Sequence, residues 1–240
     1  MKEPKDYIIF PLDFPTYDEA MSCVDILRGH VGLFKVGLEL FISQGPEIVK
    51  AVREAGNTPV FLDLKLHDIP ATVKRAFLAA CRYNPEFITV HCDEGSDILR
   101  SIADDNPGDT KILAVTLLTS LNREKLRELG YAERYAGSPS RLVLLKARIA
   151  RQAGCHGIVC SGREVAMVKN EFGDELTVVT PGIRPDWSFV AKDDQARVVT
   201  PGRAVESGAD YVVVGRPIRE AANPAEAAKR VAEEIASVLS

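Results

Sequence analysis

Short apolar runs alternate with longer segments of helical periodicity along the whole chain. The runs are rich in β-branched and aromatic residues, which is typical of buried strands. They occupy Tyr7–Leu12, Leu33–Val36, Pro59–Leu64, Phe87–Val90, Ile112–Leu117, Gly157–Val159, Thr177–Val179 and Tyr211–Val214. Most intervals between them carry a helical pattern, so the order predicts eight strand–helix units.

Several of the expected helices carry start and stop signals. The segments Thr16–Glu19 and Ser161–Glu164 have the spacing of capping boxes, in which a hydroxyl and a glutamate satisfy free amides at the start of a helix. Thr200 precedes a proline suited to the first helical turn, and Gly208 stands where that helix should stop. These signals predict where three of the helices begin.

Two helices show one apolar face each, so each is expected to pack against one wall. The faces consist of Val73, Ala76, Phe77, Ala80 and Cys81, and of Ala228, Val231, Ala232, Ile235 and Val238. Alternating strands and helices predict a parallel sheet with helices outside, and eight units in 240 residues match a closed (β/α)₈ barrel. No Pro/Ser-rich linker divides the chain, which predicts a single domain over residues 1–240.

Composition narrows the range of partners. With 46% hydrophobic and 27% charged residues, the chain has an ordinary globular composition. A net charge of −4 argues against a nucleic-acid surface or a polybasic membrane patch, so the expected partner is a small molecule.

Cysteine usage and the amino-terminal segment indicate a compartment. The five cysteines are scattered and include no Cys-x-x-Cys pair, which favours free thiols under reducing conditions. The first residues, MKEPKDYIIF, do not resemble a signal peptide, and no apolar run reaches the roughly 18 residues of a membrane span. We expect a cytoplasmic protein without membrane contact.

Charged and polar residues gather at the carboxyl ends of the expected strands, where barrels of this type carry their chemistry. In chain order they are Asp13, Lys35, Asp63, Lys65, His91, Thr119, Ser120, Arg184, Gly215 and Arg216. Asp63 and Lys65 lie two positions apart and therefore share one face of a strand. Because the helix side is apolar, we expect both to point into the barrel mouth, where Asp13 and Lys35 complete an alternating cluster of acids and bases.

Structural interpretations compete with this one. Asp63 and Lys65 could form an ion pair that only stabilises the fold, although a desolvated pair is often no more stable than an apolar replacement. Asp68 could serve as the N-cap of the helix that begins near residues 69–70. The sequence leaves that alternative open.

Four further residues also have a structural interpretation. His91 and Asp93 could contribute to a metal site, but a single His-x-Asp is more typical of a hydrogen-bonded structural histidine, so we expect no metal. Lone arginines such as Arg184 and Arg216 usually lie on the surface. Their positions after the seventh and eighth strands favour a phosphate site instead, with Gly215 allowing close backbone approach.

The segment DLKLHDIPATV, residues 63–73, resembles the D-x-K-x-x-D-I-P-x-T-V signature of the orotidine 5′-monophosphate decarboxylase family. Further segments resemble that family in the same order, namely IIFPLDF, FKVGLELF, AVTLLTS, TPGIRP and GADYVVVGRPI. The resemblance implies decarboxylation of orotidine 5′-monophosphate to uridine 5′-monophosphate, the last step of de novo uridine 5′-monophosphate synthesis, without a cofactor.

The resemblance also implies roles for individual residues. The charge network would consist of Lys35, Asp63, Lys65 and Asp68. Lys65 would protonate carbon 6 as carbon dioxide leaves, and Asp68, Ile69 and Thr72 would come from the neighbouring subunit of a homodimer. The implied substrate contacts are Asp13, Lys35, Asp63, Ile69, Thr72, Thr119, Ser120, Arg184, Gln195, Gly215 and Arg216.

Two residues depart from the family pattern. Ala71 stands where the family often has asparagine, and Pro11 stands where a small strand-forming residue is usual. Pro11 removes one hydrogen-bond donor from the first strand. Neither residue belongs to the charge network. The segment Leu121–Ser138 is charged and is expected to be helical in part.

The expected chemistry follows from physical requirements too. Loss of carbon dioxide from carbon 6 leaves a carbanion without a conjugated electron sink, so an ammonium already aimed at that carbon is a suitable catalyst. Three other functions remain alternatives. A magnesium-dependent enediolate enzyme shares a D-x-K-x-x-D strand but would carry a carboxylate in place of Lys35. A catalytically silent phosphate-binding barrel would use Asp63 and Lys65 only structurally, and a nucleic-acid module would need a basic stripe.

Overall fold

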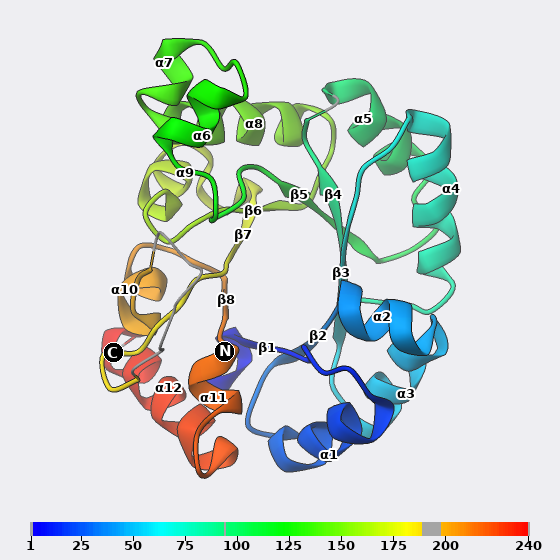
Figure 1. Cartoon of the computed structure of the whole chain (residues 1–240), viewed down its shortest axis with the longest axis vertical. Coiled ribbons are helices and arrows are strands. Elements are labelled where there is room, and N and C mark those ends of the chain that lie inside the picture. The colour runs from blue at the N-terminus through cyan, green and yellow to red at the C-terminus, as the bar shows by residue number, and fades with distance from the viewer. Residues whose placement is uncertain (1, 94, 189–197, 240) are drawn as a thin grey trace.

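The computed structural model describes residues 2–93, 95–188 and 198–239, and within them eight parallel strands close into a barrel (Figure 1). The strands are β1 (Ile8–Pro11), β2 (Leu33–Gly37), β3 (Val60–Leu66), β4 (Phe87–His91), β5 (Lys111–Val115), β6 (Gly157–Val159), β7 (Thr177–Thr180) and β8 (Tyr211–Val213). Each strand pairs with the next, and β1 pairs with β8. The predicted (β/α)₈ fold class is therefore confirmed, with each predicted strand end within two residues of the observed one.

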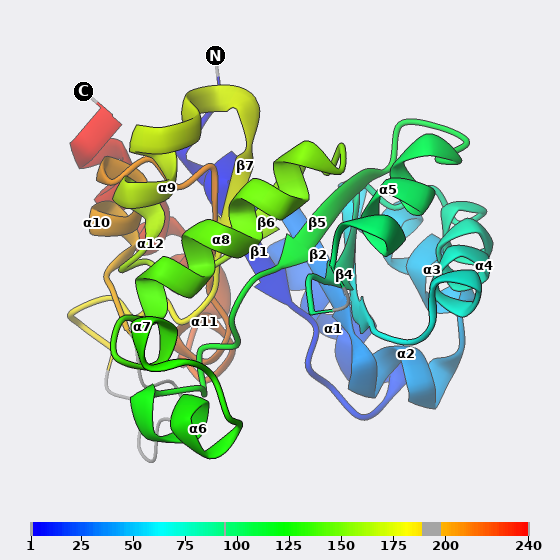
Figure 2. The same ribbon diagram turned by 90° about the horizontal axis from the view of Figure 1, so that it is seen from above.

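Helices surround this barrel on the outside (Figure 1). They are α1 (Tyr17–Leu27), α2 (Leu38–Gln44), α3 (Glu47–Gly56), α4 (Pro70–Cys81), α5 (Ser96–Asp104), α6 (Arg123–Glu128), α7 (Glu133–Ala136), α8 (Pro139–Gln152), α9 (Val165–Phe172), α10 (Pro201–Glu206), α11 (Arg216–Arg219) and α12 (Pro224–Leu239), with 3₁₀ turns at Pro4–Tyr7 and Gly173–Glu175. Figure 2 shows α2 and α6 at one end of the barrel and both termini at the opposite end. The helical expectation for Leu121–Ser138 is met by α6 and α7.

Two of the three predicted helix starts are confirmed. The amide of Glu19 donates to the Thr16 hydroxyl at 3.4 Å, and the amide of Arg203 donates to the Thr200 hydroxyl at 3.4 Å. Gly208, two positions past α10, has φ +101°, a left-handed conformation that glycine adopts without steric cost.

The third predicted start is wrong. Helix α9 begins at Val165, after Glu164, and no side chain caps it. The segment from Ser161 to Glu164 forms a turn in which the amide of Glu164 donates to the carbonyl of Ser161 at 3.0 Å. Both side chains are buried, at 1% and 3% exposure, so packing overrides the local capping pattern at this position.

Apolar side chains fill two layers. The smaller cluster lies inside the barrel and contains Ile9, Leu33, Phe61, Phe87, Leu113 and Val179, while the larger one lies between the strands and the helices. Inside the barrel, the rings of Phe61 and Phe87 meet edge to face at 5.9 Å, and Phe87 meets Tyr211 at 5.4 Å. These aromatic rings pack inside the barrel, and Phe61 also lines the cavity at the carboxyl ends of the strands.

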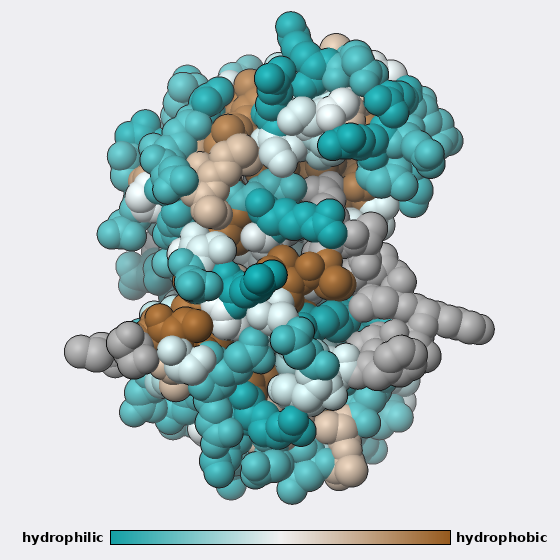
Figure 3. Space-filling view, turned by 90° about the vertical axis from the view of Figure 1, so that its left-hand side faces the viewer, coloured by the Kyte–Doolittle hydropathy of each residue, from teal (hydrophilic) through white to brown (hydrophobic). Residues whose placement is uncertain are grey.

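None of the five cysteines forms a disulfide, as predicted, and all five are buried. On the face shown in Figure 3, hydrophilic residues predominate and hydrophobic ones form separate patches. None of the helices in residues 2–93, 95–188 and 198–239 is both long and apolar enough to span a membrane.

Candidate active site

Strand β3 is irregular where it carries its charges. Its register with β4 shifts between Leu62 and Leu66. Lys65 lies in this interval with φ +50°, a left-handed conformation that costs a non-glycine residue about 1–2 kcal/mol. Its amide donates to the Thr89 hydroxyl on β4 at 2.9 Å. A side chain of the neighbouring strand therefore replaces the regular ladder bond and helps to hold Lys65 in this conformation.

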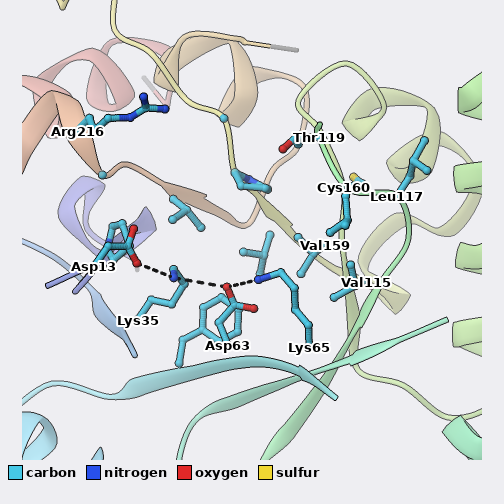
Figure 4. Close-up of a pocket in the computed structure, with 18 of the residues that line it drawn as sticks. Asp13, Lys35, Asp63, Lys65, Val115, Leu117, Thr119, Val159, Cys160 and Arg216 are labelled. Atoms are coloured by element: carbon cyan, nitrogen blue, oxygen red, sulfur yellow. Dashed lines mark hydrogen bonds and ion pairs between the residues drawn. The ribbon is translucent and has the colours of Figure 1, made fainter. Parts of the chain in front are cut away.

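Four charged side chains form one alternating line at the barrel mouth (Figure 4). Lys35 Nζ lies 3.4 Å from Asp13 Oδ1 and 3.5 Å from Asp63 Oδ2. Lys65 Nζ lies 2.8 Å from the same Asp63 oxygen. The cluster predicted from the strand ends is therefore present, with Asp63 between two ammonium groups.

The middle of this line is buried. Lys35 and Asp63 are each 8% exposed. Burial lowers the pKa of Lys35, but the carboxylates of Asp63 and Asp13 outweigh it and hold that pKa above its ordinary value. Burial raises the pKa of Asp63, but Lys35, Lys65 and a hydrogen bond from Thr89 hold that pKa below its ordinary value. Both groups are therefore ionised at neutral pH.

Beside this line lies a cavity of about 310 Å³, at the small end of the range for ligand sites. Apolar side chains line it beside the Lys65 end of the charge line, where Figure 4 shows Val115, Leu117 and Val159. The lining also includes Arg184, Arg216 and Arg219, and Figure 4 shows Arg216 on the side away from these valines. The cavity thus combines an alternating charge line, apolar side chains and three arginines.

Glycines keep backbone close to the charges. A Cβ at Gly37 would lie 3.0 Å from Lys35 Nζ, and a Cβ at Gly215 would lie 2.9 Å from Pro11 Cγ. Neither position has room for a larger side chain without displacing its neighbour.

Most of the predicted site residues meet at this cavity. Those that line it are Asp13, Lys35, Asp63, Lys65, Thr119, Arg184, Gly215 and Arg216. Ser120 is exposed and is not part of the lining. Gln195 lies outside the described residues.

The three residues expected from a neighbouring subunit do not line the cavity of their own chain. Asp68 and Ile69 are exposed, Ile69 at 67%, and Thr72 is half-buried on α4. The N-cap interpretation of Asp68 is wrong, because Ile69 occupies the cap position without a side-chain cap. The Asp68 carboxylate instead accepts a 2.6 Å hydrogen bond from the adjacent amide of Ile69.

His91 is engaged with neighbouring side chains. Its Nδ1 lies 2.8 Å from Asp93, and the other Asp93 oxygen lies 2.5 Å from Lys146 Nζ. Burial raises the pKa of Asp93, but hydrogen bonds with His91 and Lys146 outweigh it and hold that pKa far below its ordinary value. The His91 ring also packs against that of His67 at 5.0 Å. Within the described ranges, no group of three or more His, Cys, Asp or Glu side chains could hold a metal ion.

Two residues of the site escaped the sequence interpretation. Thr89 is 0% exposed, and its hydroxyl donates to Asp63 Oδ1 at 2.9 Å. A polar residue inside the apolar strand FITVH was the available signal. Arg219 lines the cavity from the end of α11, and its position three residues after Arg216 places both on one helical face.

Comparisons with known proteins identify the family of this chain. Residues 6–231 match the model of the orotidine 5'-phosphate decarboxylase / HUMPS family. A protein of Desulfosudis oleivorans named orotidine 5'-phosphate decarboxylase is 46% identical over 239 residues, covering 99% of this chain and 96% of that protein. A protein of the same name from an Anaeromyxobacter species is 45% identical over 230 residues, covering 96% and 98%.

A solved structure extends the comparison to three dimensions. The crystal structure of orotidine 5'-phosphate decarboxylase from Lactobacillus acidophilus superimposes with a TM-score of 0.80 at 33% identity, covering 95% of this chain and 98% of that one. The chain belongs to the orotidine 5'-phosphate decarboxylase / HUMPS family.

Proposed function

We propose that this chain decarboxylates orotidine 5′-monophosphate to uridine 5′-monophosphate in pyrimidine synthesis, without a metal or cofactor. One observation carries the proposal. The line Asp13, Lys35, Asp63 and Lys65 ends in an ammonium at a small cavity that is also lined by apolar side chains and by three arginines. That arrangement suits a substrate with an anionic pyrimidine at one end and a phosphate at the other.

The proposed chemistry needs one proton donor. When the bond from carbon 6 to the carboxylate breaks, its electron pair stays on carbon 6 and neutral carbon dioxide leaves. Carbon 6 then takes a proton from Lys65 Nζ. An ammonium oriented beforehand stabilises this developing charge without rearranging during the reaction, which is a large contribution in many enzymes. The 2.8 Å contact with Asp63 supplies the orientation.

The rest of the substrate supplies binding energy. In this proposal Asp13 and Lys35 hold the ribose hydroxyls, Thr119 contacts the pyrimidine, and Arg184, Gly215 and Arg216 bind the phosphate; all six line the cavity. Interactions with the distant phosphate can be used to position carbon 6 against Lys65, so their loss would lower the rate as well as the affinity. Gln195 and Ser120 are retained in the proposal as substrate contacts on the family resemblance alone.

The proposal includes a homodimer with shared sites. Large apolar side chains are exposed on α2, which follows β2, and just before α4, which follows β3, namely Leu38 at 49%, Ile42 at 77% and Ile69 at 67%. A second copy that covered them would bury this apolar surface. It would also bring Asp68, with Ile69 and Thr72, toward the cavity of its partner.

The test is turnover of orotidine 5′-monophosphate by purified protein in excess chelator, followed by substrate absorbance. Lys65→Ala is the test variant. Lys50→Ala is the matched control, because that lysine is exposed on α3, where it pairs with Glu54 at 3.9 Å, and it is not part of the cavity lining. Metal-free turnover that is lost in Lys65→Ala and kept in Lys50→Ala supports the proposal. Turnover that requires magnesium and a pentulose phosphate would point to the enediolate enzymes instead.

A further inference from the structure

The line of backbone pairing between β1 and β8, called the seam below, covers only the first residues of β1. The two strands pair through Ile8 with Val212 and Ile9 with Val213, and the amide of Val214 donates to the carbonyl of Ile9 at 3.0 Å. The ladder therefore stops just before the stretch of β1 that leads to the charge line.

Pro11 explains why the ladder stops. In a strand, the backbone groups of successive residues point to alternate sides. The Ile9 carbonyl faces β8, and the Leu12 amide faces β2, where it donates to Lys35 at 2.9 Å. The nitrogen of Pro11 must then face β8, and proline has no N–H to donate. The missing donor falls two residues before Asp13.

An arginine side chain crosses the seam at this position. Arg219 Nη1, from the end of α11, donates to the backbone carbonyl of Asp13 at 2.9 Å. The guanidinium is also held by Glu220 at 3.3 Å and lies 6.0 Å from the centre of the Phe14 ring. A charged donor to a carbonyl is stronger than an ordinary ladder bond, so this contact ties β1 to the segment after β8 beside the gap that Pro11 leaves.

Asp13 depends on such an anchor. Its side chain is 49% exposed, so packing alone does not fix the carboxylate that meets Lys35 at 3.4 Å. We propose that Arg219 is a positioning residue. It closes the seam by linking β1 to the segment after β8 near Pro11, and it fixes the backbone of Asp13 so that the carboxylate meets Lys35. The consequence for the ribose contact rests on the proposed function, whereas the closure of the seam does not.

The first test needs no substrate. Deuterium uptake by peptides covering residues 9–17 is compared between the wild-type chain, Arg219→Ala and the control Lys50→Ala, which changes an exposed residue on α3. Loss of the charge-assisted bond should raise exchange at the Leu12 amide about tenfold in Arg219→Ala. Lys50→Ala should match the wild type. Equal exchange in Arg219→Ala and the wild type would overturn the proposal.

The second test separates positioning from phosphate binding, because Arg219 also lines the cavity. A positioning role predicts that kcat for orotidine 5′-monophosphate falls about tenfold in Arg219→Ala, while inhibition by inorganic phosphate is unchanged. Weaker phosphate inhibition in Arg219→Ala, whatever its kcat, would identify Arg219 as a phosphate ligand and overturn the positioning role. If the wild-type chain fails to decarboxylate, the proposed function fails, and the exchange experiment still decides whether Arg219 closes the seam.

Discussion

Lys65 and Thr89 are coupled through one hydroxyl. The Thr89 hydroxyl accepts from the backbone amide of Lys65 at 2.9 Å and donates to Asp63 at 2.9 Å, while Asp63 pairs with the Lys65 ammonium at 2.8 Å. One buried threonine therefore orders both the backbone of the lysine and its counter-ion.

Thr89→Val should show this coupling. Valine keeps the shape of threonine but leaves a buried carboxylate oxygen and a backbone amide without their partner, which costs about 1–3 kcal/mol in the free energy of unfolding. We expect kcat to fall by at least about tenfold. Urea denaturation and steady-state kinetics measure the two effects. Thr89→Ser, which keeps the hydroxyl, is the control, and equal rates in the serine and valine variants would contradict the prediction.

The left-handed backbone at Lys65 predicts an unusual order of stability. Glycine adopts φ +50° freely, whereas alanine has the steric conflict of the lysine without its side-chain contacts. Lys65→Gly should therefore be more stable than Lys65→Ala by about 1 kcal/mol. Both variants should be inactive. Chemical denaturation of the pair tests the backbone strain, and a more stable alanine variant would argue against it.

Asp63 should make stability sensitive to acid. Its pKa in the folded chain lies below the ordinary value of 3.8, so its stabilising contribution is present above that pH and is lost as pH falls through the folded-state pKa. Asp63→Asn leaves Lys35 buried without its main counter-ion and should cost about 3 kcal/mol at pH 7.

The difference between Asp63→Asn and the wild type should shrink in acid. Unfolding by urea at pH 7 and at successively lower pH down to 3 measures it. Glu54→Gln is the control, because the exposed pair of Glu54 with Lys50 should contribute less than about 1 kcal/mol at any pH. A difference that stays constant down to the lowest pH would show that the stabilisation by Asp63 does not depend on its charge.

The proposed shared site predicts complementation. Lys65→Ala and Asp68→Ala homodimers should each be inactive, because every site lacks one group. A mixed dimer would contain one site with both groups, so activity should return when the two variants are unfolded together and refolded. Native mass spectrometry would confirm that mixed dimers form. Mixed dimers without activity would place Asp68 outside the partner's site.

Regular features of this fold were predictable because they depend on periodicity. The strands were found from short apolar runs, and the charge line followed from the rule that parallel strands end together. The local shape of β3 was not predictable in this way. Alternation alone places Asp63 and Lys65 on one face, but the conformation of Lys65 depends on Thr89, which lies 24 residues further along the chain.

Residues that act through another strand were also missed for a physical reason. Arg219 donates to the backbone carbonyl of Asp13, which lies 206 positions away in the sequence. Because every residue has such a carbonyl, the sequence does not show which one accepts the bond. The turn at Ser161 shows the opposite case, because a correct capping pattern was present locally and burial overrode it. Local patterns predict helices and strands well, while tertiary contacts decide where a helix begins and which partners the residues at its ends bind.

The positions of the site residues along the sequence affect how the site can evolve. Asp13, Lys35, Asp63, Lys65 and Thr89 all follow or belong to β1–β4, whereas the arginines of the proposed phosphate end follow β7 and β8. In the proposed function, proton transfer and recognition of the phosphate thus depend on opposite halves of the chain. Substitutions at Arg184 or Arg216 would then alter which molecules are held while leaving the acids and bases in register, so the two properties are open to separate selection.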